Sequence, residues 1–169
     1  MNPFVAALKA LLRAVCTWIV KRSCASHVGS VTANFPTRVT SSTYLGRNVH
    51  FNGLRIKGAG RVTIGDNFHS GQQILFITEY HDYDGGAALP YDPVRTISKE
   101  ITIGANVWLG DRVVVLAGVR IGEGAIIQAG SVVVSDIPPC AIAGGHPAKV
   151  FKHRNRQHYE SLLAAGKFI

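Results

Sequence analysis

One histidine of this chain lies in a short run of acidic and aromatic residues that has no regular pattern. His81 stands in the segment Glu-Tyr-His-Asp-Tyr-Asp-Gly-Gly, residues 79–86. An imidazole titrates near neutral pH, so it can take a proton from a hydroxyl as a general base. A neighbouring acceptor must then hold the ring in the tautomer that leaves the other nitrogen free. Asp82 and Asp84 are the first candidates, Glu79 and a main-chain carbonyl are alternatives, and solvated loop carboxylates are the non-catalytic interpretation.

A six-residue ladder of aliphatic side chains is the element that must carry this histidine. Every sixth position from residue 97 is aliphatic: Ile97, Ile103, Leu109, Val115, Ile121, Ile127 and Val133. Four positions after each, the residue is again small or apolar: Ile101, Val107, Val113, Val119, Ala125, Ser131 and Ile137. Glycine follows the aliphatic residue at 104, 110 and 122, where we expect corners with positive φ. A period of six suits short strands joined by sharp corners, so we expect an all-β solenoid.

The first half of the chain carries a weaker version of the same ladder. Its members are Ala33, Val39, Leu45 and Phe51 in one phase and Ile64, Ser70 and Phe76 in another. The phase slips at residues 57–60 (Lys-Gly-Ala-Gly), which we interpret as a small loop or bulge. The ladder is interrupted at about residues 78–96, and a long excursion from a regular coil is usually functional. His81 lies in that excursion.

Residues 4–20 read as an amphipathic helix within an N-terminal segment, 1–26. The apolar face holds Phe4, Leu8, Leu11, Leu12, Val15, Trp18 and Ile19, and the opposite face holds Lys9, Arg13 and Thr17. Such a helix either lies on a membrane surface or packs its apolar face against the β domain, and we favour packing. Lys9 and Arg13 make it a poor spanning helix, and Lys21-Arg22 does not resemble a signal cleavage site. Residues 153–169 form a second expected helix, with Tyr159, Leu162 and Leu163 as apolar contacts.

Composition bounds the remaining possibilities. The chain has 169 residues, 47% of them apolar and 17% charged, with 18 glycines, which fits one ordered domain rich in tight turns. The net charge of +8 suggests an anionic partner without choosing among nucleic acid, membrane and phosphorylated cofactor. The three cysteines, Cys16, Cys24 and Cys140, form no disulfide framework, which favours reduced thiols in the cytoplasm.

Residues 27–152 resemble the hexapeptide-repeat acyltransferases, in particular the branch of galactoside, maltose and exopolysaccharide O-acetyltransferases. Three stretches carry the resemblance: VTIGDN at 62–67, ITIGANVWLG at 101–110, and AGSVV at 129–133 followed by DIPP at 136–139 and GHPAKV at 145–150. The resemblance implies a left-handed parallel β-helix, a homotrimer with active sites between neighbouring coils, and acetyl-CoA as acyl donor. It also implies that His81 is the histidine that takes the proton from the acceptor hydroxyl. No metal is expected.

The same resemblance assigns residues to the binding of acetyl-CoA. They are Trp108, Gly110, Ala129, Gly130, Lys149 and Lys152. Small residues would let the pantetheine approach the backbone and the lysines would attract its phosphates, while corner geometry and core packing are the structural alternatives. Arg154 and Arg156 extend the basic group but match no family position. The sequence departs from the family at Val134-Ser135-Asp136, where relatives carry a lysine in the middle.

The acceptor side is less well marked. Residues 57–61 (Lys-Gly-Ala-Gly-Arg) replace the acidic residues of galactoside and maltose enzymes, so a lipid-linked or polymer-precursor sugar at the inner face of the cytoplasmic membrane becomes the hypothesis. An amino sugar, serine or an antibiotic is the alternative acceptor. A γ-type carbonic anhydrase would need a zinc-binding histidine spacing that His50, His69 and His81 lack. A non-catalytic scaffold or nucleic-acid binder is disfavoured because no recognisable basic and aromatic module is present.

Overall fold

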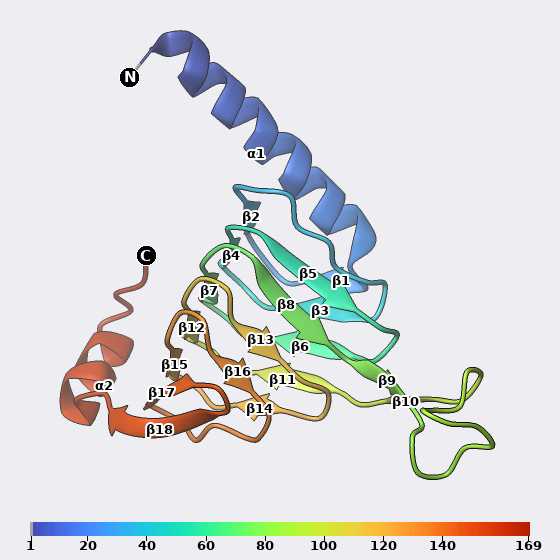
Figure 1. The fold of residues 1–169 in the computed structure, drawn as a ribbon. Helices are drawn as coiled ribbons and strands as arrows, with labels where there is room; N and C mark the ends of the chain where they lie inside the picture. The colour runs from blue at the N-terminus through green and yellow to red at the C-terminus, as the bar shows by residue number, and fades with distance from the viewer. Residues whose placement is uncertain (1) are drawn as a thin grey trace.

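The computed structural model describes residues 2–169, which fold into a parallel β-solenoid of about six turns between an N-terminal and a C-terminal helix (Figure 1). The turns contribute short parallel strands to three sheets. Sheet A contains β1 (Ser26–His27), β3 (Thr43–Leu45), β6 (Val62–Ile64), β11 (Ile101–Ile103) and β14 (Arg120–Ile121). Sheet C contains β5 (Leu54–Lys57), β8 (Ile74–Ile77), β13 (Val114–Val115) and β16 (Val132–Val133). The expected solenoid is confirmed.

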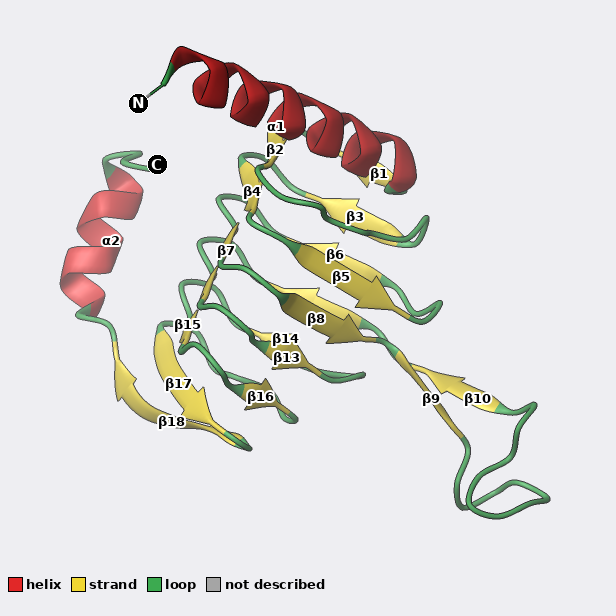
Figure 2. Ribbon diagram, turned by 45° about the horizontal axis from the view of Figure 1, so that its top comes forward, coloured by secondary structure: helices red, strands yellow, loops and turns green. Residues whose placement is uncertain are grey.

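Sheet B is the longest and ends in an antiparallel strand. Its parallel strands are β2 (Val31–Ala33), β4 (Val49–Phe51), β7 (His69–Ser70), β12 (Trp108–Leu109), β15 (Ile126–Ile127) and β17 (Ala141–Gly145). β18 (Ala148–His153) turns back and pairs antiparallel with β17, which covers the open edge of the last coil. A separate hairpin, β9 (Glu79–His81) with β10 (Thr96–Ser98), projects from the stack of coils (Figure 2).

The aliphatic ladder fills the interior of the solenoid. From Ile103 to Val133 no member of the six-residue series is more than 1% exposed, and the second series, from Ile101 to Ile137, is also buried. Stacked coils thus bury one another's apolar side chains, each contributing roughly 1.5–3 kcal/mol of transfer free energy. Ile97 is the exception: it lies in β10, pairs with Tyr80 and is only half-buried, so its inclusion in the ladder is wrong. In the first half the series is buried except for Val39, which packs at the edge of the core.

The corners follow a different rule from the one expected. Gly104, Gly110 and Gly122 do not have positive φ. The residues with positive φ between sheets A and B include Asn48, Asn67, Asn106 and Gly124, which lie above one another. The asparagine amides join successive coils, with Asn48 donating to Asn67 and Asn67 to Asn106, each at 3.0 Å. Asparagine tolerates this conformation better than other L residues, and its amide also satisfies the neighbouring corner.

Both expected helices form, but the first presents the other face to the protein. α1 (Pro3–Ser23) touches the first coil through Cys16 and Val20, and the hydroxyl of Thr17 accepts a 2.9 Å hydrogen bond from the N–H of Ala33. The apolar face from Phe4 to Ile19 stays exposed, so the prediction that it packs on the β domain is wrong. By length and hydropathy alone α1 meets the criteria for a membrane-spanning helix, which buried helices and leader sequences also meet. The second helix, α2 (Arg156–Ala164), is shorter than expected and continues into an irregular tail.

Candidate active site

The β9–β10 hairpin leaves the solenoid at the corner between sheets C and A. Glu79 and Ser98 face each other at its base, and the Glu79 carboxylate accepts a 2.8 Å hydrogen bond from the Ser98 hydroxyl. The same carboxylate accepts a 3.2 Å bond from the N–H of Ala59 in the coil below. Glu79 therefore fixes the base of the hairpin. The phase slip at residues 57–60 lies against this base, where Gly60 donates its N–H to the Thr78 hydroxyl.

His81 is the last residue of β9 and its ring is held on two sides. The imidazole stacks on Tyr91 with ring centroids 4.4 Å apart and an interplanar angle of 20°. Its Nδ1 lies 3.2 Å from the main-chain oxygen of Asp92. A carbonyl oxygen only accepts, so Nδ1 carries the proton in this contact and Nε2 is left with a free lone pair. The side chain is exposed, so a substrate can reach Nε2.

The carboxylates of Asp82 and Asp84, which neighbour His81 in sequence, do not orient its imidazole. Asp82 is buried and accepts hydrogen bonds from the N–H groups of Asp84, at 3.2 Å, and Gly85, at 2.7 Å. It also forms an ion pair with Arg95 at 3.2 Å. Asp84 is exposed. Within residues 2–169, the Nδ1–H of His81 donates to the main-chain oxygen of Asp92 and to neither of these carboxylates, so the main-chain alternative describes the orienting contact.

Asp92 organises the excursion, and the sequence interpretation missed it. Its buried carboxylate accepts N–H groups from Ala87 at 3.1 Å, Val94 at 2.8 Å and Arg95 at 2.9 Å. These hydrogen bonds, chiefly that from Arg95, hold the pKa of Asp92 below its ordinary value. Its own N–H donates to the Asp82 carbonyl at 2.8 Å. The only signal in the sequence was an aspartate before Pro93, a common turn former.

We expect Asp92→Ala to lower kcat on the order of tenfold while the solenoid stays folded. The change leaves three N–H groups of the loop without an acceptor and so frees the carbonyl that orients His81. A lowered pKa means that this stabilisation is present above the ordinary carboxyl pKa and is lost as the pH falls through the lower, folded-state value. Hydrogen exchange of the amides of residues 87, 94 and 95 between pH 3 and pH 6 measures this directly.

Asp92→Asn is the matched control because its amide oxygen still accepts but has no charge to lose. We expect it to keep most of the activity and to remove the acid-dependent loosening of the loop. Unchanged amide protection and unchanged kcat in Asp92→Ala would show that Asp92 does not position His81.

A second group of candidate residues lies on the outer face of sheet B. Trp108, on β12, pairs in register with His69 on β7, which pairs with His50 on β4. The two imidazoles are stacked, with centroids 4.5 Å apart and an interplanar angle of 5°. Burial lowers the pKa of His50 and the neighbouring His69 lowers it further, while its Nε2 contacts the Asn48 amide oxygen at 2.8 Å. Trp108 is 53% exposed, so its ring is available to a ligand.

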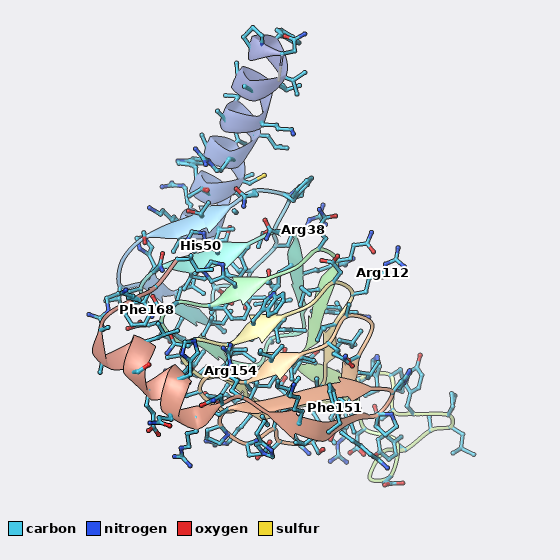
Figure 3. All side chains as sticks on the ribbon, turned by 90° about the vertical axis from the view of Figure 1, so that its left-hand side faces the viewer. Arg38, His50, Arg112, Phe151, Arg154 and Phe168 are labelled. Carbon is cyan, nitrogen blue, oxygen red and sulfur yellow. The ribbon has the colours of Figure 1, made fainter. Side chains whose placement is uncertain are left out.

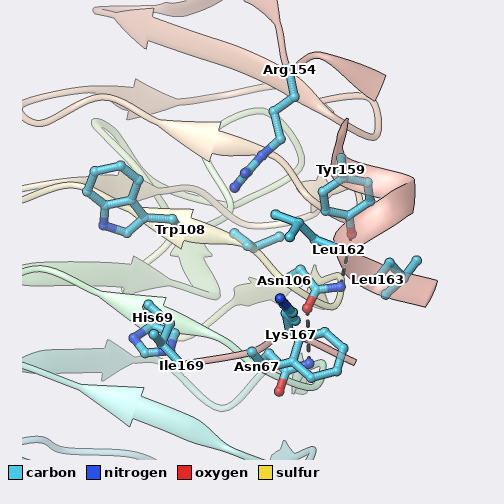
Figure 4. Close-up of a pocket in the computed structure, with 12 residues that line it drawn as sticks. Asn67, His69, Asn106, Trp108, Arg154, Tyr159, Leu162, Leu163, Lys167 and Ile169 are labelled. Atoms are coloured by element: carbon cyan, nitrogen blue, oxygen red, sulfur yellow. Dashed lines mark hydrogen bonds between the residues drawn. The ribbon is translucent and has the colours of Figure 1, made fainter. Parts of the chain in front are cut away.

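A pocket of about 570 Å³ opens beside these residues, between sheet B, α2 and the C-terminal tail (Figure 4). Sheet B contributes His69 and Trp108 to its lining, α2 contributes Leu162, and the C-terminal tail contributes Phe168. The buried Nε2 of His69 is without a hydrogen-bond partner among the described residues. No group of three or more His, Cys, Asp or Glu side chains in residues 2–169 is arranged to hold a metal ion.

α2 is fixed to the solenoid by one tyrosine. The Tyr159 hydroxyl donates to the Glu123 carboxylate at 2.8 Å and accepts from the Asn106 amide at 2.9 Å, which continues the asparagine ladder (Figure 4). Burial, together with the hydrogen bond to Glu123, raises the pKa of Tyr159 to about 12. The guanidinium of Arg154 donates to the Gly124 carbonyl at 2.6 Å and lies over the Tyr159 ring. Arg154 is thus part of the fold.

The residues predicted to bind the acyl donor lie along the last coils. A Cβ on Gly110 would come within 2.5 Å of the Ala129 nitrogen, so Gly110 is needed for coil packing. Gly130 has φ +73° and open space where a Cβ would point, and Ala129 beside it is exposed. Lys149 and Lys152 are exposed on β18, whereas Arg156 pairs with Glu160 at 3.0 Å. Ala129, Gly130 and the two lysines are therefore exposed, whereas Gly110 is needed for packing between coils.

A single chain does not bring the two groups together. The hairpin that carries His81 leaves the corner between sheets A and C, which is opposite sheet B, and it projects away from the body (Figure 1). Trp108 faces outward from sheet B. His81 therefore lies apart from His50 and His69 as well, and the three histidines form no common site.

Comparisons with known proteins find a matching family model, similar curated proteins and similar solved structures. Residues 100–135 match the family model described as bacterial transferase hexapeptide (six repeats). Galactoside O-acetyltransferase of Escherichia coli K12 is 37% identical over 126 residues, 70% of this chain and 59% of that protein. A galactoside acetyltransferase solved in complex with coenzyme A matches with a TM-score of 0.63 and 30% identity over 94% of this chain and 76% of the other. The chain belongs to the hexapeptide-repeat transferase family.

Other members of the hexapeptide-repeat transferase family show the same likeness. A hexapeptide-repeat acetyltransferase of Vibrio cholerae, complexed with acetyl coenzyme A, has a TM-score of 0.60 and 25% identity over 90% of each chain. The family resemblance inferred from the three sequence stretches is thereby confirmed. The chain spans less than two thirds of the curated galactoside O-acetyltransferase that it matches.

Proposed function

We propose that this chain transfers an acetyl group from acetyl-CoA to a hydroxyl of a sugar acceptor. The observation that carries the proposal is the tautomer of His81, an exposed side chain whose Nδ1 donates to the Asp92 carbonyl and so leaves the lone pair of Nε2 available. His81 is then the general base: Nε2 takes the hydroxyl proton as the oxygen attacks the thioester carbonyl. The carbon–sulfur bond breaks, and the departing CoA thiolate takes the proton from the imidazolium. Membership of a transferase family and CoA-bound structural neighbours support this chemistry.

We propose that the working enzyme is a homotrimer. The separation of His81 from Trp108 within one chain supports this, because a second copy can supply the hairpin to the sheet B face of the first. Cyclic symmetry with three copies gives three equivalent sites of this composite kind. Light scattering of the purified chain checks the stoichiometry. Mixing His81→Ala and Trp108→Ala chains should restore part of the activity, since one site in the mixture receives both intact residues.

The acceptor is a hydroxyl-bearing sugar in this proposal, in a lipid-linked or polymer-precursor form handled at the cytoplasmic face of the membrane. Galactoside O-acetyltransferase, the relative described above, acts on a sugar by its name. Release of CoA thiol from acetyl-CoA, measured against sugars, nucleotide sugars, amino sugars and serine, tests the class. Turnover restricted to amine acceptors would indicate N-acylation instead. Absence of CoA release with every acceptor would contradict the proposal.

Lys149 and Lys152 are proposed to bind the phosphates of CoA, and their joint replacement by alanine tests this. We expect the KM for acetyl-CoA to rise on the order of tenfold with little change in kcat, because both lysines are exposed and act by charge attraction. Arg156→Ala is the matched control, since that cation is on α2 and is paired with Glu160. If the KM for a donor that lacks the 3′-phosphate rises equally, the lysines contact the pyrophosphate. If the KM for neither donor changes, the two lysines do not bind the donor.

A further inference from the structure

We infer that α1 lies flat on an anionic lipid surface and holds the first coil of the solenoid against it. This inference goes beyond the proposed acetyl transfer and concerns residues outside the candidate active site. Its starting point is the way in which α1 meets the protein. Cys16, Thr17 and Val20 face the first coil, and the rest of the helix continues past the solenoid (Figure 3).

The face of α1 that points away from the protein is its apolar one. At 100° per residue, Phe4, Leu11, Val15 and Trp18 share a side nearly opposite Val20. Their exposed fractions are 75% for Phe4, 62% for Leu11, 46% for Val15 and 63% for Trp18. A helix that only covers the end of a solenoid would bury this side. The arrangement suits a surface that accepts an apolar stripe containing phenylalanine and tryptophan, as the boundary of a bilayer does.

Charge identifies the kind of surface. Residues 1–65 contain nine Lys and Arg and no Asp or Glu, whereas residues 66–169 contain nine Lys and Arg and ten Asp and Glu. Residues 1–65 therefore carry a formal charge of +9 and residues 66–169 carry −1, so the positive excess belongs to α1 and the first coils, which lie at the same end of the molecule (Figure 1). Basic residues near an anionic leaflet are attracted to it, so this end of the molecule suits an anionic surface. A second copy of this chain would bring the same positive charge to the same face, which disfavours it as the occupant.

The length of the part of α1 that extends beyond its contact with the solenoid indicates how the helix lies relative to the bilayer. Because Cys16, Thr17 and Val20 are held against the solenoid, only residues 3–15 could enter a bilayer lengthwise, whereas Trp18 can reach a lipid surface from the side. Thirteen helical residues extend about 20 Å, less than the hydrocarbon core of about 30 Å. An in-plane helix needs no such length, and it keeps Lys9 and Arg13, which lie opposite the apolar stripe, out of the hydrocarbon. If three copies assemble as proposed above, cyclic symmetry puts three such helices on one side.

Flotation with vesicles tests the inference on the full chain. We expect binding to vesicles of phosphatidylcholine and phosphatidylglycerol, at least tenfold weaker binding to phosphatidylcholine alone, and weakening at high salt. The variant Leu11→Gln with Trp18→Gln should lose at least tenfold of this binding and still fold, since both side chains are exposed. Val134→Gln, a 47% exposed apolar residue at the far end of the solenoid, is the matched control.

Two results would overturn the inference. One is flotation of the double variant equal to that of the wild type. The other is a lower oligomeric state of the double variant in light scattering, which would assign the face to contact between copies. Thiol release from acetyl-CoA with a soluble acceptor, measured without lipid, is expected to be the same for the double variant and the wild type, so failure of lipid binding is distinguishable from failure of the transferase proposal.

Discussion

His81→Ala is expected to lower kcat for acetyl transfer on the order of a hundredfold or more while the chain stays folded and still binds CoA. Loss of a general base typically costs this much, because the acceptor hydroxyl must then give up its proton to water. The side chain is exposed and its hydrogen bond runs to a loop carbonyl, so its removal leaves the apolar core intact. Steady-state kinetics with the acceptor found by the thiol-release screen measures the loss, and circular dichroism and CoA titration confirm fold and binding.

His158→Ala is the control, because it removes an exposed histidine from α2 at a distance from the hairpin. If His81→Ala kept near wild-type turnover, the base would be another residue.

The six-residue period predicted the solenoid because each coil repeats the same sequence pattern, so successive coils stack apolar residues on equivalent apolar residues. Its failure at Ile97 has a physical cause. Ile97 falls on the same count as the ladder but stands in the excursion, where β10 pairs with β9 and no longer with a coil. Periodicity alone cannot show where the chain leaves the stack of coils, because Ile97 is aliphatic and stands six residues before Ile103 without belonging to a coil.

Amphipathicity predicted which residues of α1 share a face but gave the wrong orientation. The prediction assumed that an apolar face turns toward the protein. Thr17, which belongs to the polar side, instead accepts the N–H of Ala33 at the open edge of β2, where a backbone donor needs a partner. That requirement belongs to the first coil and is invisible in the helix sequence.

The candidate site was predicted in part. His81 was identified by its place in the interruption, whereas Asp92 stands eleven residues away and reaches the site only through the fold of the excursion. Carboxylates next to a histidine in sequence are attractive partners, yet Asp82 points back into the loop and caps the N–H of Gly85. Adjacency along a turn does not fix side-chain direction, so the orienting group could not be chosen from the sequence.

The glycines after the ladder residues provide the prediction with the largest expected effect on stability. A Cβ on Gly104 would lie 2.6 Å from the nitrogen and 2.9 Å from the Cα of Glu123 in the next coil. Both are backbone atoms, so neither can swing away as the end of a side chain could. Gly65 and Gly122 stand in the same column, with nearest backbone nitrogens at 2.6 and 2.5 Å. The glycine is therefore required by the spacing of the coils and not by its own φ.

We expect Gly104→Ala to lower the free energy of unfolding by about 1–3 kcal/mol or more, as overpacking in a close-packed interior does. Replacing glycine also reduces the entropy of the unfolded chain, which stabilises by about 0.4–1 kcal/mol, but that gain is smaller than the cost of separating two coils. Chemical denaturation and the melting temperature measure the difference.

Gly130→Asn is the matched control, because Gly130 has φ +73° with nothing within 4 Å of a Cβ, and asparagine tolerates that conformation. We expect its stability to stay within about 0.5 kcal/mol of the wild type. If Gly104→Ala were as stable as this control, the coils would not be fixed by backbone contact at that corner. The same control separates packing from binding: a normal melting temperature with a raised KM for acetyl-CoA would assign Gly130 to the donor groove, whereas Gly104→Ala should impair activity only as far as it unfolds the coil.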